Sequence, residues 1–270
     1  MDKITIQNLE IFANHGVYPE ENVLGQKFIV SAVLYTDTRK AGQSDTLEHS
    51  TNYGEVCHFM KNFVEKHTFK LIESVAEHLA EEVLLSFPLI RKLDLEIKKP
   101  WAPISLPLDT VSVRISRGWH TAYIALGSNL GDKKGYLDMA VSMLKAHRLC
   151  RVAKVSDYLI TEPYGGVAQD DFLNGVLELH TLLTPTELLD ELHVIEQAAH
   201  RERLIHWGPR TLDLDILLYD DLILDSEELH IPHIEMHKRD FVLIPLAQIA
   251  PFVRHPRLGL TVSELKDRLE

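Results

Sequence analysis

Two aspartates at alternate positions, Asp213 and Asp215, have the spacing in this chain that says most about chemistry. They follow a Gly-Pro turn and Arg210, and the alternation of leucine and aspartate around them predicts a β-strand. Both carboxylates then point to one face of the strand, while the apolar residues point into the core. Adjacent carboxylates repel each other unless a cation lies between them, and Mg²⁺ prefers such ligands. The pattern indicates either a solvated acidic edge strand or a metal site, and Arg210 favours a site for a metal-bound polyphosphate.

The loop at residues 127–133 contains two glycines and a lysine and at first resembles a phosphate-binding loop. Its second glycine comes one position too early for a P-loop, and no Ser or Thr follows the lysine. We therefore interpret the loop as a structural turn. Other basic side chains are the candidates for phosphate binding, because converging positive charges neutralise the charge that develops in phosphoryl transfer. These candidates are Arg201, Arg203, Arg210, His233 and Arg239, although each alone also fits a solvated surface charge.

The composition is that of a globular protein with one large domain or two ordinary ones: 270 residues, 45% hydrophobic and 25% charged. The net charge of −12 argues against a nucleic-acid-binding protein. Residues 121–270 hold 24 acidic against 15 basic side chains, so a phosphate there needs local arginines and a metal. Two cysteines distant in sequence predict neither a disulfide framework nor a zinc site. With no signal pattern and no membrane-spanning run, we expect a cytoplasmic protein that does not bind membranes.

Apolar periodicity predicts two α+β domains, residues 1–118 and 121–270, with the boundary where the pattern breaks at residues 117–120. In the first domain we expect two strands, two helices and two strands, at residues 3–12, 27–35, 54–65, 73–86, 92–98 and 110–115.

The second domain is expected to contain strand, helix, two strands, helix and the acidic strand, with the elements before that strand at residues 121–126, 134–146, 153–160, 173–181 and 185–200. Thr184 and Glu187 form a capping-box pattern at the start of the last helix. This β-α-β-β-α-β order predicts a ferredoxin-like domain.

Residues 122–129, 171–174, 207–216 and 231–233 resemble the motifs of 6-hydroxymethyl-7,8-dihydropterin pyrophosphokinase, and the resemblance extends over about residues 120–270. It implies pyrophosphoryl transfer from ATP to the pterin hydroxymethyl group, with release of AMP. By the same resemblance, Asp213 and Asp215 hold two Mg²⁺ ions, and Arg201 and Arg210 act on the phosphates. The implied ATP contacts are Glu196, Arg201, Arg203, Trp207, Arg210, Ile216, His233 and Arg239; the implied pterin contacts are Thr161, Tyr164, Phe172, Asn174 and Phe241.

In the first domain, four polar residues attract attention: Glu21, Tyr53, Glu73 and Lys99. Each alone fits a helix cap or a solvated side chain, and the dipole of a helix favours a carboxylate where Glu73 begins one. The histidines of this domain are scattered without the spacing of metal ligands, so we expect no metal there.

Residues 15–22, 44–55, 71–77 and 98–100 resemble dihydroneopterin aldolase, whose subunits have the tunnelling fold, over about residues 1–118. That family cleaves the pterin side chain in a retro-aldol step that releases glycolaldehyde and needs neither metal nor Schiff base. The resemblance implies that Glu73 and the Ile72 backbone hold the pterin, Lys99 and Tyr53 transfer protons, and Glu21 positions the side-chain hydroxyls. Lys98 is the rival of Lys99, because neighbours on a strand face opposite sides.

The two resemblances support each other, because the product of the first reaction is the substrate of the second. We therefore expect a bifunctional enzyme of folate biosynthesis that binds pterins and ATP and forms a homo-oligomer through its first domain, with Tyr53 serving a neighbouring site. Two alternatives concern the first domain: an epimerase that acts on the same side chain, and an inactive pterin-binding scaffold for oligomerisation.

Overall fold

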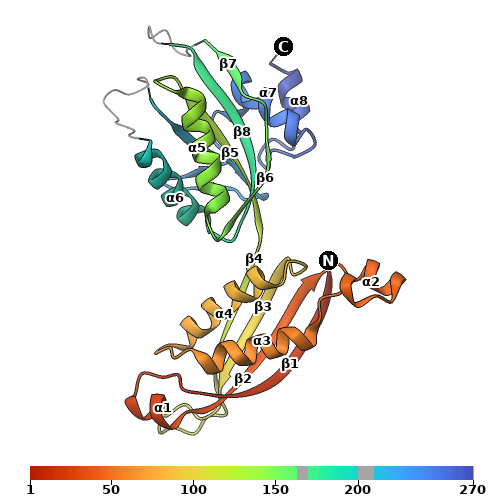
Figure 1. The fold of residues 1–270 in the computed structure, drawn as a ribbon, viewed down its shortest axis with the longest axis vertical. Coiled ribbons are helices and arrows are strands. Elements are labelled where there is room, and N and C mark those ends of the chain that lie inside the picture. Colours follow the sequence, from red (N-terminus) through yellow and green to blue (C-terminus); the bar gives the residue numbers. More distant parts are fainter. Residues whose placement is uncertain (163–169, 200–209, 270) are drawn as a thin grey trace. The chain divides into compact units, whose positions relative to one another are not determined.

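The computed structural model describes residues 1–162, 170–199 and 210–269. It divides into two compact units, Met1–Trp119 and His120–Glu270, which we describe separately (Figure 1). None of the described helices is both long enough and apolar enough to cross a membrane.

Unit 1 is a four-stranded antiparallel sheet with two long helices on one face (Figure 1). The strands lie in the order of the sequence: β1 (Asp2–Ala13), β2 (Gln26–Thr36), β3 (Lys92–Lys99) and β4 (Val111–Gly118). The helices α3 (Tyr53–Lys66) and α4 (Ile72–Ser86) connect β2 to β3. The expected order of two strands, two helices and two strands is confirmed. Three short helices that the periodicity did not predict are also present: α1 (Pro19–Leu24), α2 (Arg39–Ser44) and a 3₁₀ turn at Leu47–His49.

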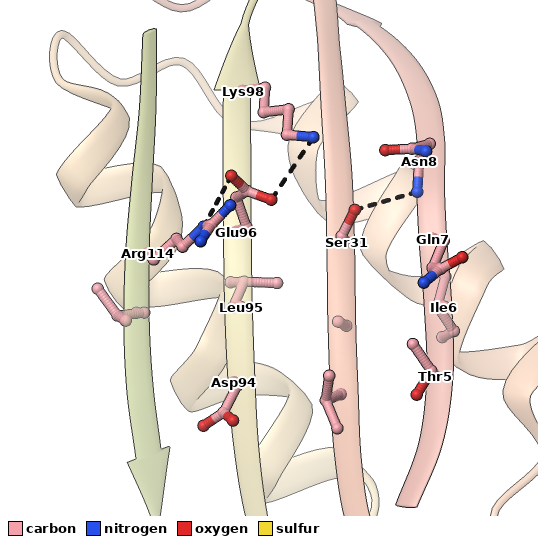
Figure 2. A pocket seen from close by; sticks show the side chains of 13 residues that line it. Thr5, Ile6, Gln7, Asn8, Ser31, Asp94, Leu95, Glu96, Lys98 and Arg114 are labelled. Atoms are coloured by element: carbon pink, nitrogen blue, oxygen red, sulfur yellow. Dashed lines mark hydrogen bonds and ion pairs between the residues drawn. The ribbon is translucent and has the colours of Figure 1, made fainter.

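The alternating sequence of β3 decides which side chains face the helices of unit 1. Leu93, Leu95 and Ile97 are fully or almost fully buried, and they pack beneath the helices. Asp94, Glu96 and Lys98 alternate with them and lie on the open face of the sheet (Figure 2). Because the last residue of the strand has the parity of the buried set, Lys99 points to the helix-covered side.

Unit 2 has a central sheet of order β6-β8-β5-β9, in which all pairs of neighbours are antiparallel. Its strands are β5 (His120–Ser128), β6 (Cys150–Val155), β7 (Leu159–Thr161), which pairs with β8, β8 (Phe172–Thr181) and β9 (Asp213–Tyr219). The helices α5 (Lys133–Ala146) and α6 (Pro185–Ala198) follow β5 and β8. This order and pairing confirm the ferredoxin-like arrangement. The strand expected at residues 153–160 is interrupted, because residues 156–158 separate β6 from β7.

Each face of this sheet has its own apolar core. One face packs against α5 and α6 through residues such as Ile124, Leu137 and Leu192. The other face packs against α7 (Asp240–Ile249) and α8 (Val262–Asp267) through Val176, Leu243 and Leu265. A short hairpin, β10 (Leu224–Asp225) with β11 (His230–Ile231), and a 3₁₀ turn at Met236–Lys238 lead to α7.

The capping box expected at the start of α6 is present. The Thr184 hydroxyl accepts from the Glu187 N–H, and the Glu187 carboxylate accepts from the Thr184 N–H. It fixes where α6 begins.

Candidate active sites

A buried ion pair joins two of the expected site residues of unit 1. Nζ of Lys99, at the end of β3, lies 2.5 Å from Oε1 of Glu21 in α1, and the two side chains are only 12% and 9% exposed. Glu21 also accepts from Nε2 of Gln26 at 2.9 Å and from the Tyr18 N–H at 3.1 Å. Burial alone would raise the pKa of Glu21, but the hydrogen bonds from Lys99, Tyr18 and Gln26 hold it below its usual value. Glu21 is therefore ionised and fixed in place beside the Lys99 ammonium group.

Lys98 lies on the opposite face of the sheet and has a different partner. Its Nζ is 3.6 Å from Oε2 of Glu96, whose other oxygen accepts from Nε of Arg114 at 2.9 Å. Figure 2 shows these three side chains on the open face, where they line a depression of about 410 Å³ with residues of β1 and β2. Lys99 is thus the lysine that lies with Glu21.

The remaining expected residues of unit 1 lie at the starts of its two long helices. Tyr53 is the first residue of α3 and is 63% exposed. Ile72 and Glu73 form the first turn of α4, where Glu73 is exposed and Ile72 half-buried. Within unit 1, therefore, Tyr53 and Glu73 present their polar groups to solvent, whereas Glu21 and Lys99 are enclosed.

A buried histidine ties the segment before α1 to the segment before α4. Nδ1 of His15 accepts from the Phe69 N–H at 3.1 Å, and the Gly16 N–H donates to the Phe69 carbonyl at 3.0 Å. Burial lowers the pKa of His15 to about 4, so the ring is neutral and its proton is on Nε2. His15 is one of the histidines of this domain that are scattered without metal-ligand spacing. Its partner is 54 residues away, and no local pattern signals such a contact.

Gly16 lies so close to the Glu21 carboxylate that a side chain cannot be added there without moving it. We expect Gly16→Ala to displace Glu21 from Lys99 and to lower the retro-aldol activity that the sequence resemblance implies for this unit, measured as glycolaldehyde release, by about 10²-fold, the effect of a misplaced group. The melting temperature should fall as well, because the φ of Gly16, +157°, is one that L side chains rarely adopt and because the displaced carboxylate leaves Lys99 without its partner. The matched control is Gly42→Ala, since nothing lies within 4 Å of an added Cβ at Gly42. Equal aldolase rates in the two variants would show that the position of Glu21 does not matter.

The paired aspartates of unit 2 open β9, as the alternation predicted. Leu212, Leu214 and Ile216 are buried, whereas Asp213 and Asp215 are partly exposed. Burial, and then the neighbouring Asp213 carboxylate, raise the pKa of Asp215 to about 7. The two groups therefore resist being charged together, which is the condition that a bound cation relieves.

Two further side chains organise this acidic strand. Nη1 of Arg210 lies 2.7 Å from Oδ2 of Asp213. Glu196, near the end of α6, is buried, and its Oε1 accepts from the Leu214 N–H at 2.8 Å. This bond holds the backbone between the two aspartates, so Glu196 fixes their spacing. Among the described residues, no group of three or more His, Cys, Asp or Glu side chains could hold a metal ion, so the candidate donor set is the aspartate pair.

A second cluster of side chains, His233, Arg239 and Phe241, follows β11 and brings a positive charge together with two rings. Nδ1 of His233 accepts from the Glu235 N–H at 3.2 Å, and burial together with the charge of Arg239 lowers the pKa of His233 to about 4. Arg239 donates to Glu235 at 2.8 Å and lies 5.6 Å from the centre of the Phe241 ring. His233 is thus neutral, with Nε2 as a donor. The positive charge of Arg239 offsets part of the rise in the pKa of Asp215.

Three of the expected pterin contacts meet where β7 pairs with β8. Thr161 lies opposite Phe172 in the register, and Nδ2 of Asn174 donates to the Thr161 hydroxyl at 2.8 Å. Asn174 also lies opposite Gly127, and Gly127 lies opposite Asp213, so these polar groups share one end of the sheet. The side chain of Ile216 belongs to the apolar core, which leaves only its backbone for a ligand. Tyr164, Arg201, Arg203 and Trp207 lie outside the described residues.

The fold consists of two α+β units, one with a buried lysine–carboxylate pair and one with paired aspartates. Residues 4–116 match the family model of dihydroneopterin aldolase, and residues 123–251 match that of 7,8-dihydro-6-hydroxymethylpterin-pyrophosphokinase. The chain belongs to these two families, one in each unit.

Relatives of this chain include proteins that resemble one part of it and proteins that resemble it throughout. The 2-amino-4-hydroxy-6-hydroxymethyldihydropteridine pyrophosphokinase of Bacillus subtilis is 48% identical over 47% of this chain and 77% of its own length. The bifunctional protein FolKE of Lactococcus lactis is 48% identical over 48% of this chain and 37% of its own length. The folic acid synthesis protein FOL1 of Dictyostelium discoideum is 30% identical over 98% of this chain and 44% of its own length. The matched part is thus less than half of the last two relatives.

Proposed function

We propose that the chain catalyses two consecutive steps of folate biosynthesis. In the first, 7,8-dihydroneopterin is cleaved to 6-hydroxymethyl-7,8-dihydropterin and glycolaldehyde. In the second, ATP transfers its pyrophosphoryl group to the new hydroxymethyl oxygen, and AMP leaves. The observation that carries the proposal is that the Lys99–Glu21 pair and the Asp213–Asp215 pair occur in one chain, in units of two families whose reactions follow each other.

In unit 1, we assign proton transfer to Lys99 and Tyr53. Loss of the proton from the second hydroxyl of the substrate side chain breaks the adjacent carbon–carbon bond, and glycolaldehyde leaves. The bonding electrons move into the C=N bond of the dihydropterin ring, and protonation of the side-chain carbon then completes the hydroxymethyl product. Glu21 positions the hydroxyl groups of the substrate side chain beside Lys99. Glu73 and the Ile72 backbone hold the pterin ring. The Glu21 carboxylate holds the Lys99 side chain at the reacting end of the substrate, where its amine accepts the hydroxyl proton and then returns a proton to the side-chain carbon.

In unit 2, Asp213 and Asp215 fit two Mg²⁺ ions, because they are adjacent carboxylates on one strand face and hard oxygen ligands suit this ion. When bound, Mg²⁺ polarises the phosphates and offsets their charge. Arg210 and Arg239 neutralise charge on the transferred group, and His233 donates a hydrogen bond from Nε2. Phe172 and Phe241 stack on the pterin, and Thr161 and Asn174 bind its edge. We assign Arg201, Arg203, Trp207 and Glu196 to the ATP side and Tyr164 to the pterin side.

We also propose that unit 1 forms a homo-oligomer in which Tyr53 serves the site of a neighbouring copy. Its ring is 63% exposed, although its proposed role needs a sheltered position. Large apolar side chains of the same unit are exposed as well, among them Val23 at 79% and Leu24 at 73% in α1. Such exposure is typical of a surface that another subunit covers.

A coupled assay tests the proposed function. Purified chain supplied with dihydroneopterin should release glycolaldehyde, and addition of ATP with Mg²⁺ should then release one AMP for each hydroxymethylpterin consumed. Release of ADP instead of AMP would contradict pyrophosphoryl transfer. An epimerised side chain without glycolaldehyde would assign unit 1 to the epimerase alternative, and pterin binding without turnover would assign it to the scaffold alternative.

A further inference from the structure

The loop after β5, which has the composition but not the spacing of a P-loop, makes bonds to both sides of the site in unit 2. Asn129 is fully buried, and its N–H donates to the Arg210 carbonyl at 3.1 Å. Its side-chain Oδ1 accepts from the Arg210 N–H at 2.7 Å. Both backbone groups of Arg210 are therefore held by one asparagine, 81 residues away in the sequence.

The same loop also holds the segment that leads into the expected pterin contact Phe172. Nδ2 of Asn129 donates to the Asp170 carbonyl at 3.4 Å, and Nζ of Lys133 donates to the Asp171 carbonyl at 2.6 Å. Because β5 lies between β8 and β9 in the sheet, a loop at its end reaches the chain on either side.

We propose that residues 129–133 form a bracket that sets the distance between the phosphate side and the pterin side of unit 2. Asn129 and Lys133 act as positioning residues, and the ligand reaches neither of them. Asn129 suits this place because its amide both accepts and donates, so it can bind an N–H on one side and a carbonyl on the other. Lys133 uses its charge on a backbone carbonyl and not on a phosphate, which explains a lysine in a loop without P-loop geometry.

The inference rests on the proposed function of unit 2 and predicts a split between the two substrates. In the part of the chain that the structure describes, Lys133 bonds to the pterin side alone. Lys133→Met should therefore raise the KM and Kd for 6-hydroxymethyl-7,8-dihydropterin about tenfold, the loss expected for one charge-assisted hydrogen bond. The KM for ATP should stay unchanged. Asn129 holds both sides, so Asn129→Ala should weaken the binding of both ATP and the pterin and should also lower kcat.

Two neighbouring residues provide matched controls. Lys134 has the same charge but is exposed and pairs with Asp138 in its own helix, so Lys134→Met should match the wild type. Ser128 is as buried as Asn129, but among the described residues its hydroxyl has no hydrogen-bond partner, so Ser128→Ala should match the wild type too. Asn129→Asp keeps the acceptor for the Arg210 N–H and loses the donor to Asp170. It should therefore restore much of the ATP affinity that Asn129→Ala loses, and less of the pterin affinity.

The experiment measures initial rates with each substrate varied, and equilibrium binding of the pterin and of Mg·ATP by calorimetry, all on the full chain. Thermal unfolding of unit 2, followed by circular dichroism in each variant, reports whether that unit is folded, because glycolaldehyde release reports on unit 1 alone. The bracket is refuted if Lys133→Met and Lys134→Met have the same KM and Kd for the pterin. It is also refuted if Lys133→Met weakens the binding of ATP instead of the binding of the pterin. Failure of the proposed function is a separate result: the wild-type chain itself would then release no AMP, and the binding measurements alone would decide on the bracket.

Discussion

Replacement of Lys99 by methionine should abolish the first reaction and leave the second intact. Glycolaldehyde release is expected to fall by about 10²- to 10⁴-fold, the contribution of a positioned acid or base. AMP formation from added hydroxymethylpterin should continue at the wild-type rate, since unit 2 has its own cores. The measurement is the ratio of the two product rates in one sample, which cancels errors in protein concentration.

The ion pair complicates this variant, because Lys99→Met leaves the Glu21 carboxylate buried without its cation. Removal of one partner of a buried pair costs about 3–5 kcal/mol. The double variant Lys99→Met with Glu21→Gln should recover most of this stability without recovering activity. Lys98→Met is the control from the open face of the sheet and should remain active. If Lys98→Met is inactive and Lys99→Met is active, the assignment of the catalytic lysine is wrong.

Replacement of Asp215 by asparagine should abolish AMP formation and leave glycolaldehyde release unchanged. Loss of a metal-bound carboxylate removes several kcal/mol of charge stabilisation from the transition state, which corresponds to about 10³-fold in rate. Without Mg²⁺ at pH 8, the same variant should melt at a higher temperature than the wild type. The reason is that burial and the Asp213 carboxylate raise the pKa of Asp215 to about 7, so its ionisation opposes folding increasingly as the pH rises above the ordinary value of 3.8, and the full cost is present above about 7.

The two effects of Asp215→Asn separate a metal site from a solvated acidic strand. Added Mg²⁺ should raise the melting temperature of the wild type and change that of Asp215→Asn far less. Asp221→Asn removes one exposed carboxylate just after the same strand and should change neither result. A solvated acidic strand would give the opposite outcome, in which Asp215→Asn and Asp221→Asn have the same activity and the same response to Mg²⁺.

Local patterns predicted the elements of both units and the strand that holds the aspartates. The alternation around Asp213 and the capping box of Thr184 each depend on residues a few positions apart, so a sequence carries them in full. The break between β6 and β7 was missed, because Ser156, Asp157 and Tyr158 were included in one strand with the apolar residues on either side of them. The short helices α1 and α2 were also missed; neither buries an apolar residue, so neither has an apolar stripe to detect.

The contacts that complete the sites were beyond prediction, because they join distant segments. The bond from Phe69 to His15 and the bond from Arg210 to Asn129 exist only once the strands have paired. The choice between Lys98 and Lys99 is intermediate. Alternation predicts that the two face opposite sides and that Lys99 shares the side of the apolar residues, but its contact with Glu21 exists only in the folded unit.

Only Trp119 separates the last strand of unit 1 from the first strand of unit 2, yet each unit has its own apolar core. A lesion at Lys99 and a lesion at Asp215 therefore damage different folding units. In genetic terms, we expect the two halves of the chain to mutate independently, as two separate genes would. Two defective alleles, one affected in each half, should complement each other in the same cell, provided that the pterin intermediate diffuses between copies.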